Sequence, residues 1–213
     1  LIPVIEITNY DEGIKSPDSG PFWKYPDEWE SFNNLTNSKA GFSDKLKSYL
    51  KGSSLYKIDE ITNDDLYQAV LSEIKKQAPG DEDDDILACA FSGGYVLRIN
   101  NDDKYFPQCC GDLADIREWE NLINGNTRFF YPGHPFPKVT IDDNKLYFDF
   151  VDIEIKENFA PPVSEKIIVI KKSELEAAIK SVKYELEIFI DRLKNINKEN
   201  NLNIPNIECL VFG

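Results

Sequence analysis

A long apolar stripe near the C-terminal end predicts the longest helix of the chain. The stripe consists of Leu175, Ile179, Val182, Leu186, Ile190 and Leu193, with lysines, glutamates and asparagines between them. This spacing keeps one helix face apolar, and Ser173 with Glu176 forms the predicted capping box at its start. A helix with one apolar face must cover another surface, so we expect it to pack on a sheet.

Short β-rich segments separated by turn residues predict that sheet. Residues 86–91 and 95–100 flank Ser-Gly-Gly, which predicts one hairpin. Residues 138–141 and 145–151 flank Asp-Asp-Asn and predict a second hairpin, which we expect Ile153 and Ile155 to extend. Further strands are predicted at residues 1–8, 166–170 and 209–212.

Capping residues predict the remaining helices. Thr62 with Asp65, and Asp112 with Asp115, precede apolar stripes that end near Pro79-Gly80 and Gly125. Residues 43–50 predict a short helix before Gly52, and Pro26 predicts the first turn of another. The predicted fold is therefore an α+β fold, an antiparallel or mixed sheet from hairpins with three or more helices packed on it. We expect a single domain over residues 1–213, with an irregular subregion at 9–60.

Charge limits the classes of partner. The 213 residues include 24 Lys plus Arg against 38 Asp plus Glu, a formal net charge of −14. Such a field repels phosphate backbones and anionic lipid surfaces, so we expect neither nucleic acid nor membrane as a partner. A basic protein is the expected partner, and the sequence leaves the oligomeric state open. The acidic run at residues 81–85 lacks the spaced ligands of a calcium loop and predicts a solvated loop.

Cysteine usage and the first residues predict a cytoplasmic location. Four cysteines, two of them adjacent, do not form the framework of a disulfide-rich secreted protein. The beginning of the sequence has neither the basic region nor the long apolar region of a signal peptide.

Residues 105–137 concentrate the reactive side chains. They contain Cys109, Cys110, Trp119 and the single histidine, His134. The two cysteines precede a predicted helix start, where the helix dipole can lower the pKa of a thiol. Because Asp112 and Asp115 occupy the same end, and because free cysteines are usually buried, we expect the pair to be buried in a tight turn.

Metal binding and catalysis both have candidate residues here. Adjacent side chains of an extended chain point to opposite faces, so we expect no structural zinc site and no cofactor. A catalytic metal held by His134 and one or two carboxylates stays open as an alternative. So does a cysteine hydrolase built from Cys110, His134, Asp112 and Asp115, or a glycosidase with paired carboxylates.

Aromatic residues predict a binding surface. Trp23, Tyr25, Trp29 and Phe32 lie in a segment rich in proline, and aromatic side chains are enriched as anchors of protein interfaces. Together with Trp119 and His134 they are the predicted binding residues.

The central stretch resembles a group of small uncharacterised bacterial proteins. The resemblance is carried by Cys109-Cys110-Gly111-Asp112-Leu113-x-Asp115-x-x-x-Trp119-Glu120, by Gly133-His134-Pro135-x-Pro137, and by a strand that bears Asp149. It implies that these positions form a shared structural centre and implies no activity.

The sequence predicts a protein-interaction function, because it combines a negative net charge, a segment rich in aromatic residues and no complete set of catalytic residues. We expect an acidic protein of the immunity or antitoxin type that neutralises a basic partner, by analogy of class with other acidic bacterial proteins of this size. The alternative is a hydrolase, dependent on cysteine or on a metal, centred on Cys110 and His134.

Overall fold

The computed structural model describes residues 1–77, 87–127 and 130–213. The fold is α+β, with helices and two sheets of four and three strands, which confirms the predicted class. The chain forms two compact units, Leu1–Pro3 with Ser92–Glu187 and Val4–Phe91 with Ile188–Gly213. This division does not test whether either unit folds alone, so the single domain stays a prediction.

The three-stranded sheet belongs to the first unit. It consists of β5 (Lys138–Asp142), β6 (Lys145–Asp149) and β7 (Ile167–Lys171), all antiparallel and adjacent in that order. Leu146 pairs with Ile170 and Phe148 with Ile168, and all four side chains are buried. The predicted hairpin at the Asp-Asp-Asn turn is confirmed.

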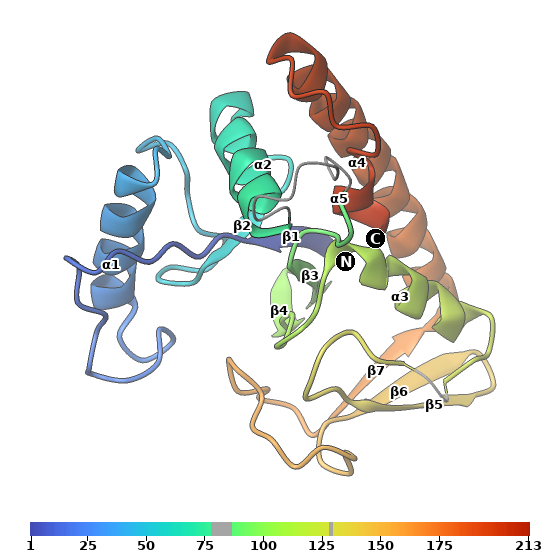
Figure 1. The fold of residues 1–213 in the computed structure, drawn as a ribbon. Coiled ribbons are helices and arrows are strands. Elements are labelled where there is room, and N and C mark those ends of the chain that lie inside the picture. The colour runs from blue at the N-terminus through green and yellow to red at the C-terminus, as the bar shows by residue number, and fades with distance from the viewer. Residues whose placement is uncertain (78–86, 128–129) are drawn as a thin grey trace. The chain divides into compact units, whose positions relative to one another are not determined.

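Helix α3 (Ile116–Ile123) packs on this sheet (Figure 1). It follows a 3-10 turn at Leu113–Asp115. The ring of Trp119 is fully buried and lies 5.1 Å from that of Phe130 and 6.0 Å from that of Phe148. Trp119 is therefore a core residue, and its ring cannot contact a partner directly in this structure.

The hairpin of β3 (Gly93–Ile99) and β4 (Asp102–Tyr105) differs from the prediction. The chain turns at Asn100 and Asn101, which have φ values of 52° and 63°, because asparagine tolerates the left-handed conformation. Gly93 and Gly94 begin β3 instead of forming the turn. Residues 87–91 form no strand, and Ile86 lies outside the described residues, as does the acidic run 81–85.

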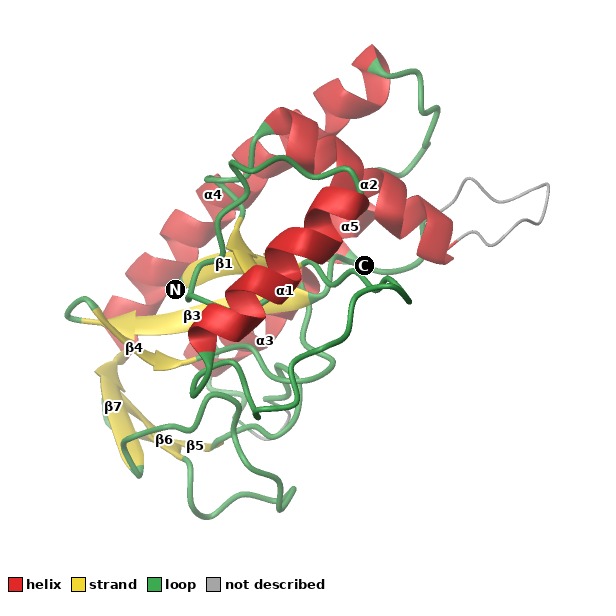
Figure 2. Cartoon of the chain, turned by 90° about the vertical axis from the view of Figure 1, so that its left-hand side faces the viewer, coloured by secondary structure: helices red, strands yellow, loops and turns green. Residues whose placement is uncertain are grey.

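The second unit is mainly helical (Figure 2). It contains α1 (Pro26–Lys39), β2 (Leu55–Lys57), α2 (Asn63–Gln77) and α5 (Cys209–Phe212). Strand β1 (Ile2–Glu6) continues into it from the first unit and pairs there with β2 in an antiparallel arrangement. Thr62 caps α2 as predicted, since its Oγ1 accepts from the Asp65 backbone N–H at 3.1 Å.

Three predicted elements of this chain are wrong. Residues 43–50 form no helix and have a turn only at 44–45, and Ser43 is held from outside the segment, since its backbone N–H donates to Asp65 at 2.7 Å and its hydroxyl to the same carboxylate at 2.8 Å. Residues 209–212 form the helix α5, not a strand. Ile153 and Ile155 extend no strand, since the Asp149 carboxylate accepts from the N–H groups of the next turn.

The longest helix is α4 (Lys172–Glu199), which continues from the first unit into the second. Every member of the predicted stripe is buried, from Leu175 to Leu193. The start differs from the prediction, since Glu174 and not Glu176 accepts the backbone N–H, which comes from Lys171 at 3.2 Å. Among the described residues, no helix is both long and apolar enough to cross a membrane.

Candidate functional site

A left-handed turn at Cys110 brings two thiols together. Cys110 has a φ of 66°, and the backbone N–H of Gly111 donates to the carbonyl of Gln108 at 3.1 Å. The Sγ atoms of Cys109 and Cys110 lie 3.5 Å apart, and both side chains are exposed. The predicted burial of the pair is wrong, and the opposite orientation expected from an extended chain does not occur, because Cys110 is not extended.

The loop before His134 is joined to this turn through the backbone. The N–H of His134 donates to the carbonyl of Cys109 at 2.9 Å, within an antiparallel bridge between the two residues. Gly133 has a φ of 93°, and a Cβ there would lie 2.7 Å from the Cys109 carbonyl oxygen. Only glycine allows this approach without displacement, so Gly133 fixes the place of His134.

Gln108 connects the same turn to a third segment. Its side-chain oxygen accepts from the backbone N–H of Ala160 at 2.9 Å, and its amide nitrogen donates to the carbonyl of Phe106 at 2.8 Å. The side chain is buried, and a buried amide is stable when its polar atoms are paired. These bonds hold the chain around residue 160 against the cysteine turn, and Glu157 lies three residues earlier.

Cys110, His134 and Glu157 form a continuous chain of hydrogen bonds. The Sγ of Cys110 lies 3.7 Å from Nε2 of His134, and Nδ1 of His134 lies 2.8 Å from Oε2 of Glu157. Sequence analysis did not identify Glu157. The sequence contains 38 Asp and Glu residues, and the sequence around Glu157 does not distinguish it from the others.

The neighbours shift both titrating groups toward their charged forms. The pKa of the Cys110 thiol is lowered by the Cys109 thiol and then by His134, against the opposing effects of desolvation and of the Glu157 charge. The pKa of His134 is raised by its hydrogen bond to Glu157 and then by Cys110. A hydrogen bond to the charged form favours that form, so the geometry favours a thiolate beside an imidazolium.

Asp112 and Asp115 are used at the start of the helix. Asp112 accepts from the Ala114 backbone N–H at 2.7 Å, and Asp115 accepts from the Asp112 N–H at 2.9 Å, which completes the predicted capping box. Burial raises the pKa of both carboxyl groups, that of Asp115 to about 7. These carboxylates therefore cap the 3-10 turn that precedes α3.

The predicted aromatic binding residues lie around the start of α1 in the second unit. Tyr25 is 40% exposed, while Trp23, Trp29 and Phe32 are half-buried. The indole N–H of Trp29 donates to the carbonyl of Gly20 at 2.7 Å, and its ring packs edge-on against Phe32. The rings therefore organise the preceding loop and leave part of their surface to solvent.

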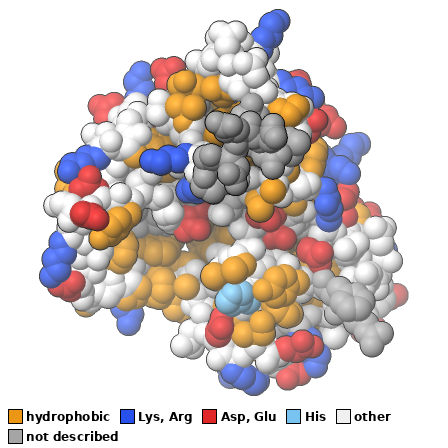
Figure 3. All heavy atoms as spheres, viewed as in Figure 1, with side chains coloured by type: hydrophobic (Ala, Val, Ile, Leu, Met, Phe, Trp, Pro, Cys, Tyr) orange, Lys and Arg blue, Asp and Glu red, His pale blue; other side chains and the backbone are white. Residues whose placement is uncertain are grey.

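The single histidine lies at the surface. Figure 3 shows its ring in pale blue, beside an acidic side chain and surrounded by side chains of the hydrophobic colour class, which includes cysteine and proline. The His134 side chain is 27% exposed and that of Glu157 50% exposed. A large molecule can therefore reach the cluster from solvent.

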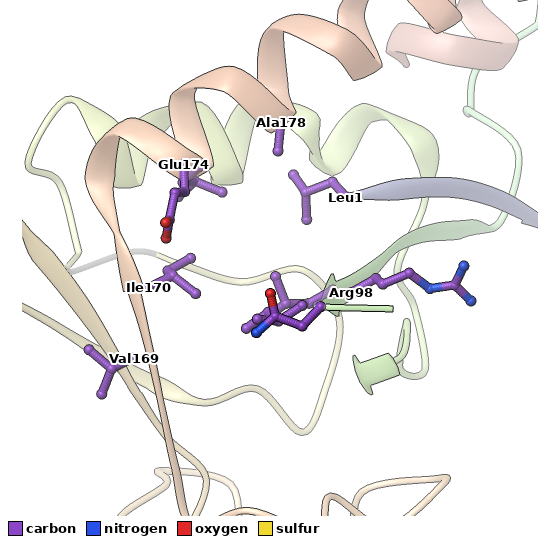
Figure 4. A pocket seen from close by; sticks show the side chains of 10 residues that line it. Leu1, Arg98, Val169, Ile170, Glu174 and Ala178 are labelled. Atoms are coloured by element: carbon purple, nitrogen blue, oxygen red, sulfur yellow. The ribbon is translucent and has the colours of Figure 1, made fainter. Parts of the chain in front are cut away.

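A separate cavity of about 380 Å³ lies between β3, β7 and α4 in the first unit. Ile170, Glu174, Ala178 and Leu1 point into the same space, whereas the guanidinium of Arg98 points away (Figure 4). Arg98 donates to Asp103 at 2.6 Å instead. The residues that line this cavity include neither a cysteine nor the histidine.

No protein-family model, curated protein or solved structure matches this chain. Cys109, Cys110, His134 and Glu157 are named here the thiol cluster. A thiol next to an imidazole that a carboxylate orients is the arrangement that nucleophilic catalysis by cysteine needs.

Proposed function

We propose that the chain is a cysteine-dependent hydrolase in which Cys110 is the nucleophile. His134 is the general base and acid, and Glu157 orients its ring and stabilises its protonated form. The observation that carries the proposal is the unbroken contact from Cys110 Sγ to His134 Nε2 and from His134 Nδ1 to Glu157 Oε2. Asp112 and Asp115, which the sequence suggested as catalytic partners, form the capping box at the start of the 3-10 turn before α3.

The chemistry follows from the protons that these atoms hold. The Cys110 thiolate attacks a carbonyl carbon, and the new S–C bond forms as the bond to the leaving group breaks. The leaving group departs with the electron pair and takes the proton from His134 Nε2. Water then attacks the thioester, gives its proton to His134 Nε2, and the S–C bond breaks to restore the thiolate.

The surroundings indicate the substrate class. The thiol cluster is exposed, which suits an ester or amide group carried by a large molecule. The formal net charge of −14 favours a cationic substrate. A reducing compartment keeps the adjacent thiols of Cys109 and Cys110 from oxidation, so a cytoplasmic location is part of this proposal.

An acyl ester gives the direct test. With p-nitrophenyl acetate and a metal chelator present, we expect a burst of p-nitrophenolate, an acetyl group on Cys110 and continued turnover. Cys110→Ser should lose the burst, and Cys209→Ser, in the second unit, should keep it. Equal acetylation of Cys110 and Cys209, or a burst without turnover, contradicts the hydrolase.

The resemblance to the small bacterial proteins fits the same centre. Its Cys-Cys segment and its Gly-His segment are the two that the bridge between Cys109 and His134 joins. We propose that this bridge is the shared structural centre of such proteins.

A second candidate function is neutralisation of a basic partner protein by an acidic immunity-type protein. The observation that favours it is a shallow groove of about 450 Å³ on α1, in the second unit. Phe32 and Leu35 line it together with Asp27 and Glu28, and Leu35 is 57% exposed. Lys15 also lines the groove and Lys51 pairs with Asp27, which leaves the Glu28 carboxylate beside the apolar side chains. Such a surface complements an apolar anchor next to a lysine or arginine.

The groove can be tested apart from the thiol cluster. Basic proteins captured from host lysate should be released by salt, and Leu35→Asp should lose them while Leu202→Asp, a half-buried position outside the groove, keeps them. Capture that survives both high salt and Leu35→Asp contradicts this function. Cys110→Ser should leave capture unchanged.

A further inference from the structure

The thiol cluster contains the ligand atoms of a soft metal site. The Sγ atoms of Cys109 and Cys110 and a ring nitrogen of His134 all lie within 4.8 Å of one another. Thiolate and imidazole are the ligands that Zn²⁺ and Cu⁺ prefer, whereas Mg²⁺ and Ca²⁺ prefer oxygen. We propose that these three residues bind one soft metal ion, and that this ion is Zn²⁺.

The distances match a tetrahedral ion. With Zn–S near 2.3 Å and Zn–N near 2.05 Å, a regular tetrahedron places two sulfurs about 3.8 Å apart and a sulfur and a nitrogen about 3.6 Å apart. The cluster has 3.5 Å between the two Sγ atoms and 3.7 Å between Cys110 Sγ and His134 Nε2. These two distances thus lie close to the tetrahedral values, and the third, between Cys109 Sγ and the His134 ring nitrogen, is within 4.8 Å and would shorten when an ion binds.

The backbone holds the ligands in place before any ion arrives. The left-handed φ of Cys110 points both thiols to one side, and the bridge from Cys109 to His134 fixes the third ligand beside them. A site organised in advance loses little conformational entropy on binding, which favours affinity.

Glu157 supplies the support that a ligating histidine normally has. Nδ1 of His134 lies 2.8 Å from the Glu157 carboxylate, which leaves the lone pair of Nε2 for the ion. Such outer partners fix the tautomer and the ring orientation, and their loss costs about 10–100-fold in metal affinity.

The ligand count leaves one position for a solvent molecule. Three protein ligands with an open fourth position are typical of sites that exchange their ion or bind a further molecule. An ion bound here would occupy the sulfur that attacks substrate in the hydrolase proposal, so metal binding would inhibit it reversibly. The metal proposal does not rest on hydrolysis.

Titration with Zn²⁺ against a chromophoric chelator, and with Co²⁺ followed by absorption, tests the site on the full chain. We expect one equivalent bound, with sulfur-to-cobalt charge transfer and the intense visible bands of tetrahedral Co²⁺. Cys109→Ser, Cys110→Ser and His134→Ala should each weaken Zn²⁺ by more than tenfold, and Glu157→Gln by about tenfold. The double variant Cys89→Ser/Cys209→Ser should bind as the unchanged chain does.

The outcomes separate the two proposals. Absence of saturable binding, or affinity that Cys109→Ser and His134→Ala leave unchanged, overturns the metal site. Because the ester assay contains a chelator, its result does not depend on metal. If a ligand variant unfolds, the exposed Glu157→Gln substitution still gives the test, and unchanged Zn²⁺ affinity in that variant contradicts the role of Glu157.

Discussion

Two pairs of cysteines in this chain have the same chemistry and opposite environments. In the first unit, the pKa of Cys110 is lowered by the Cys109 thiol and by His134. In the second unit, the pKa of Cys209 is raised, first by burial and then by the charge of Cys89. None of these four cysteines is part of a disulfide. The two thiols therefore differ in the direction of the pKa shift, and Cys110 has both a second thiol at 3.5 Å and an imidazole at 3.7 Å beside it.

Cys209 is therefore an internal control for Cys110. Alkylation by iodoacetamide depends on the thiolate fraction, so the ratio of the two alkylation rates in one sample removes differences in reagent and buffer. The substitutions below change His134, residues that hold or flank it, and control positions.

The largest expected effect comes from His134→Ala. Removal of the imidazole deprives the thiolate of a cationic partner, and a change of one pKa unit alters the thiolate fraction about tenfold at neutral pH. We expect alkylation of Cys110 to slow by about tenfold while Cys209 is unchanged, as measured by peptide mass spectrometry. An unchanged ratio would show that His134 does not activate the thiol.

Gly133→Ala should slow Cys110 by displacing the loop that carries His134. The new Cβ would lie 2.7 Å from the Cys109 carbonyl oxygen at a φ of 93°, and a strained residue of this kind costs about 1–3 kcal/mol. We expect a loss of stability of that size in urea unfolding, with slower alkylation of Cys110. Gly125→Ala is the matched control, since its φ is 85° and no atom lies within 4 Å of the new Cβ; it should lose stability without slowing Cys110.

Glu157→Gln should have a smaller effect on the thiol. The amide keeps a hydrogen bond to His134 but removes the negative charge that stabilises the imidazolium. We expect alkylation of Cys110 to slow by about two- to fivefold at neutral pH, less than the roughly tenfold effect of a full pKa unit. Glu154→Gln, an exposed acid nearby in sequence, should leave the rate unchanged; a larger effect than that of His134→Ala would contradict the order of roles.

Asp115→Asn should leave the ratio of rates unchanged and alter stability instead. Burial raises the pKa of Asp115 from 3.8 to about 7, with the charges of Asp112 and Glu118 acting in the same direction. The folded protein thus binds this proton more tightly than the unfolded chain, so this contribution to stability falls as pH rises from 3.8 to about 7. We expect the variant to gain stability relative to the unchanged chain at pH 8 compared with pH 4, in thermal unfolding.

The sequence predicted best what depends on local pattern. The capping box of Asp112 and Asp115, the stripe of α4 and the hairpin of β5 and β6 all follow from residues within a few positions of one another. The turn of the first hairpin is harder to predict, because Gly93-Gly94 and Asn100-Asn101 both favour positive φ and both adopt it, but only the asparagine pair forms the turn.

The thiol cluster was only partly predictable. Cys110 and His134 were identified by residue type, whereas their meeting depends on one left-handed residue and a backbone bridge between segments more than 20 positions apart. Glu157 comes from a third segment, held by Gln108. Long-range contacts of this kind leave no periodic signal in one sequence.

The measurement that tests the central claim most directly is the ratio of alkylation rates of Cys110 and Cys209 at neutral pH, with a chelator present, before and after His134→Ala. We expect Cys110 to react faster than Cys209, and the variant to lose a part of this advantage. Equal rates in the unchanged chain, or the same advantage after loss of the imidazole, would contradict the activation of Cys110 by His134.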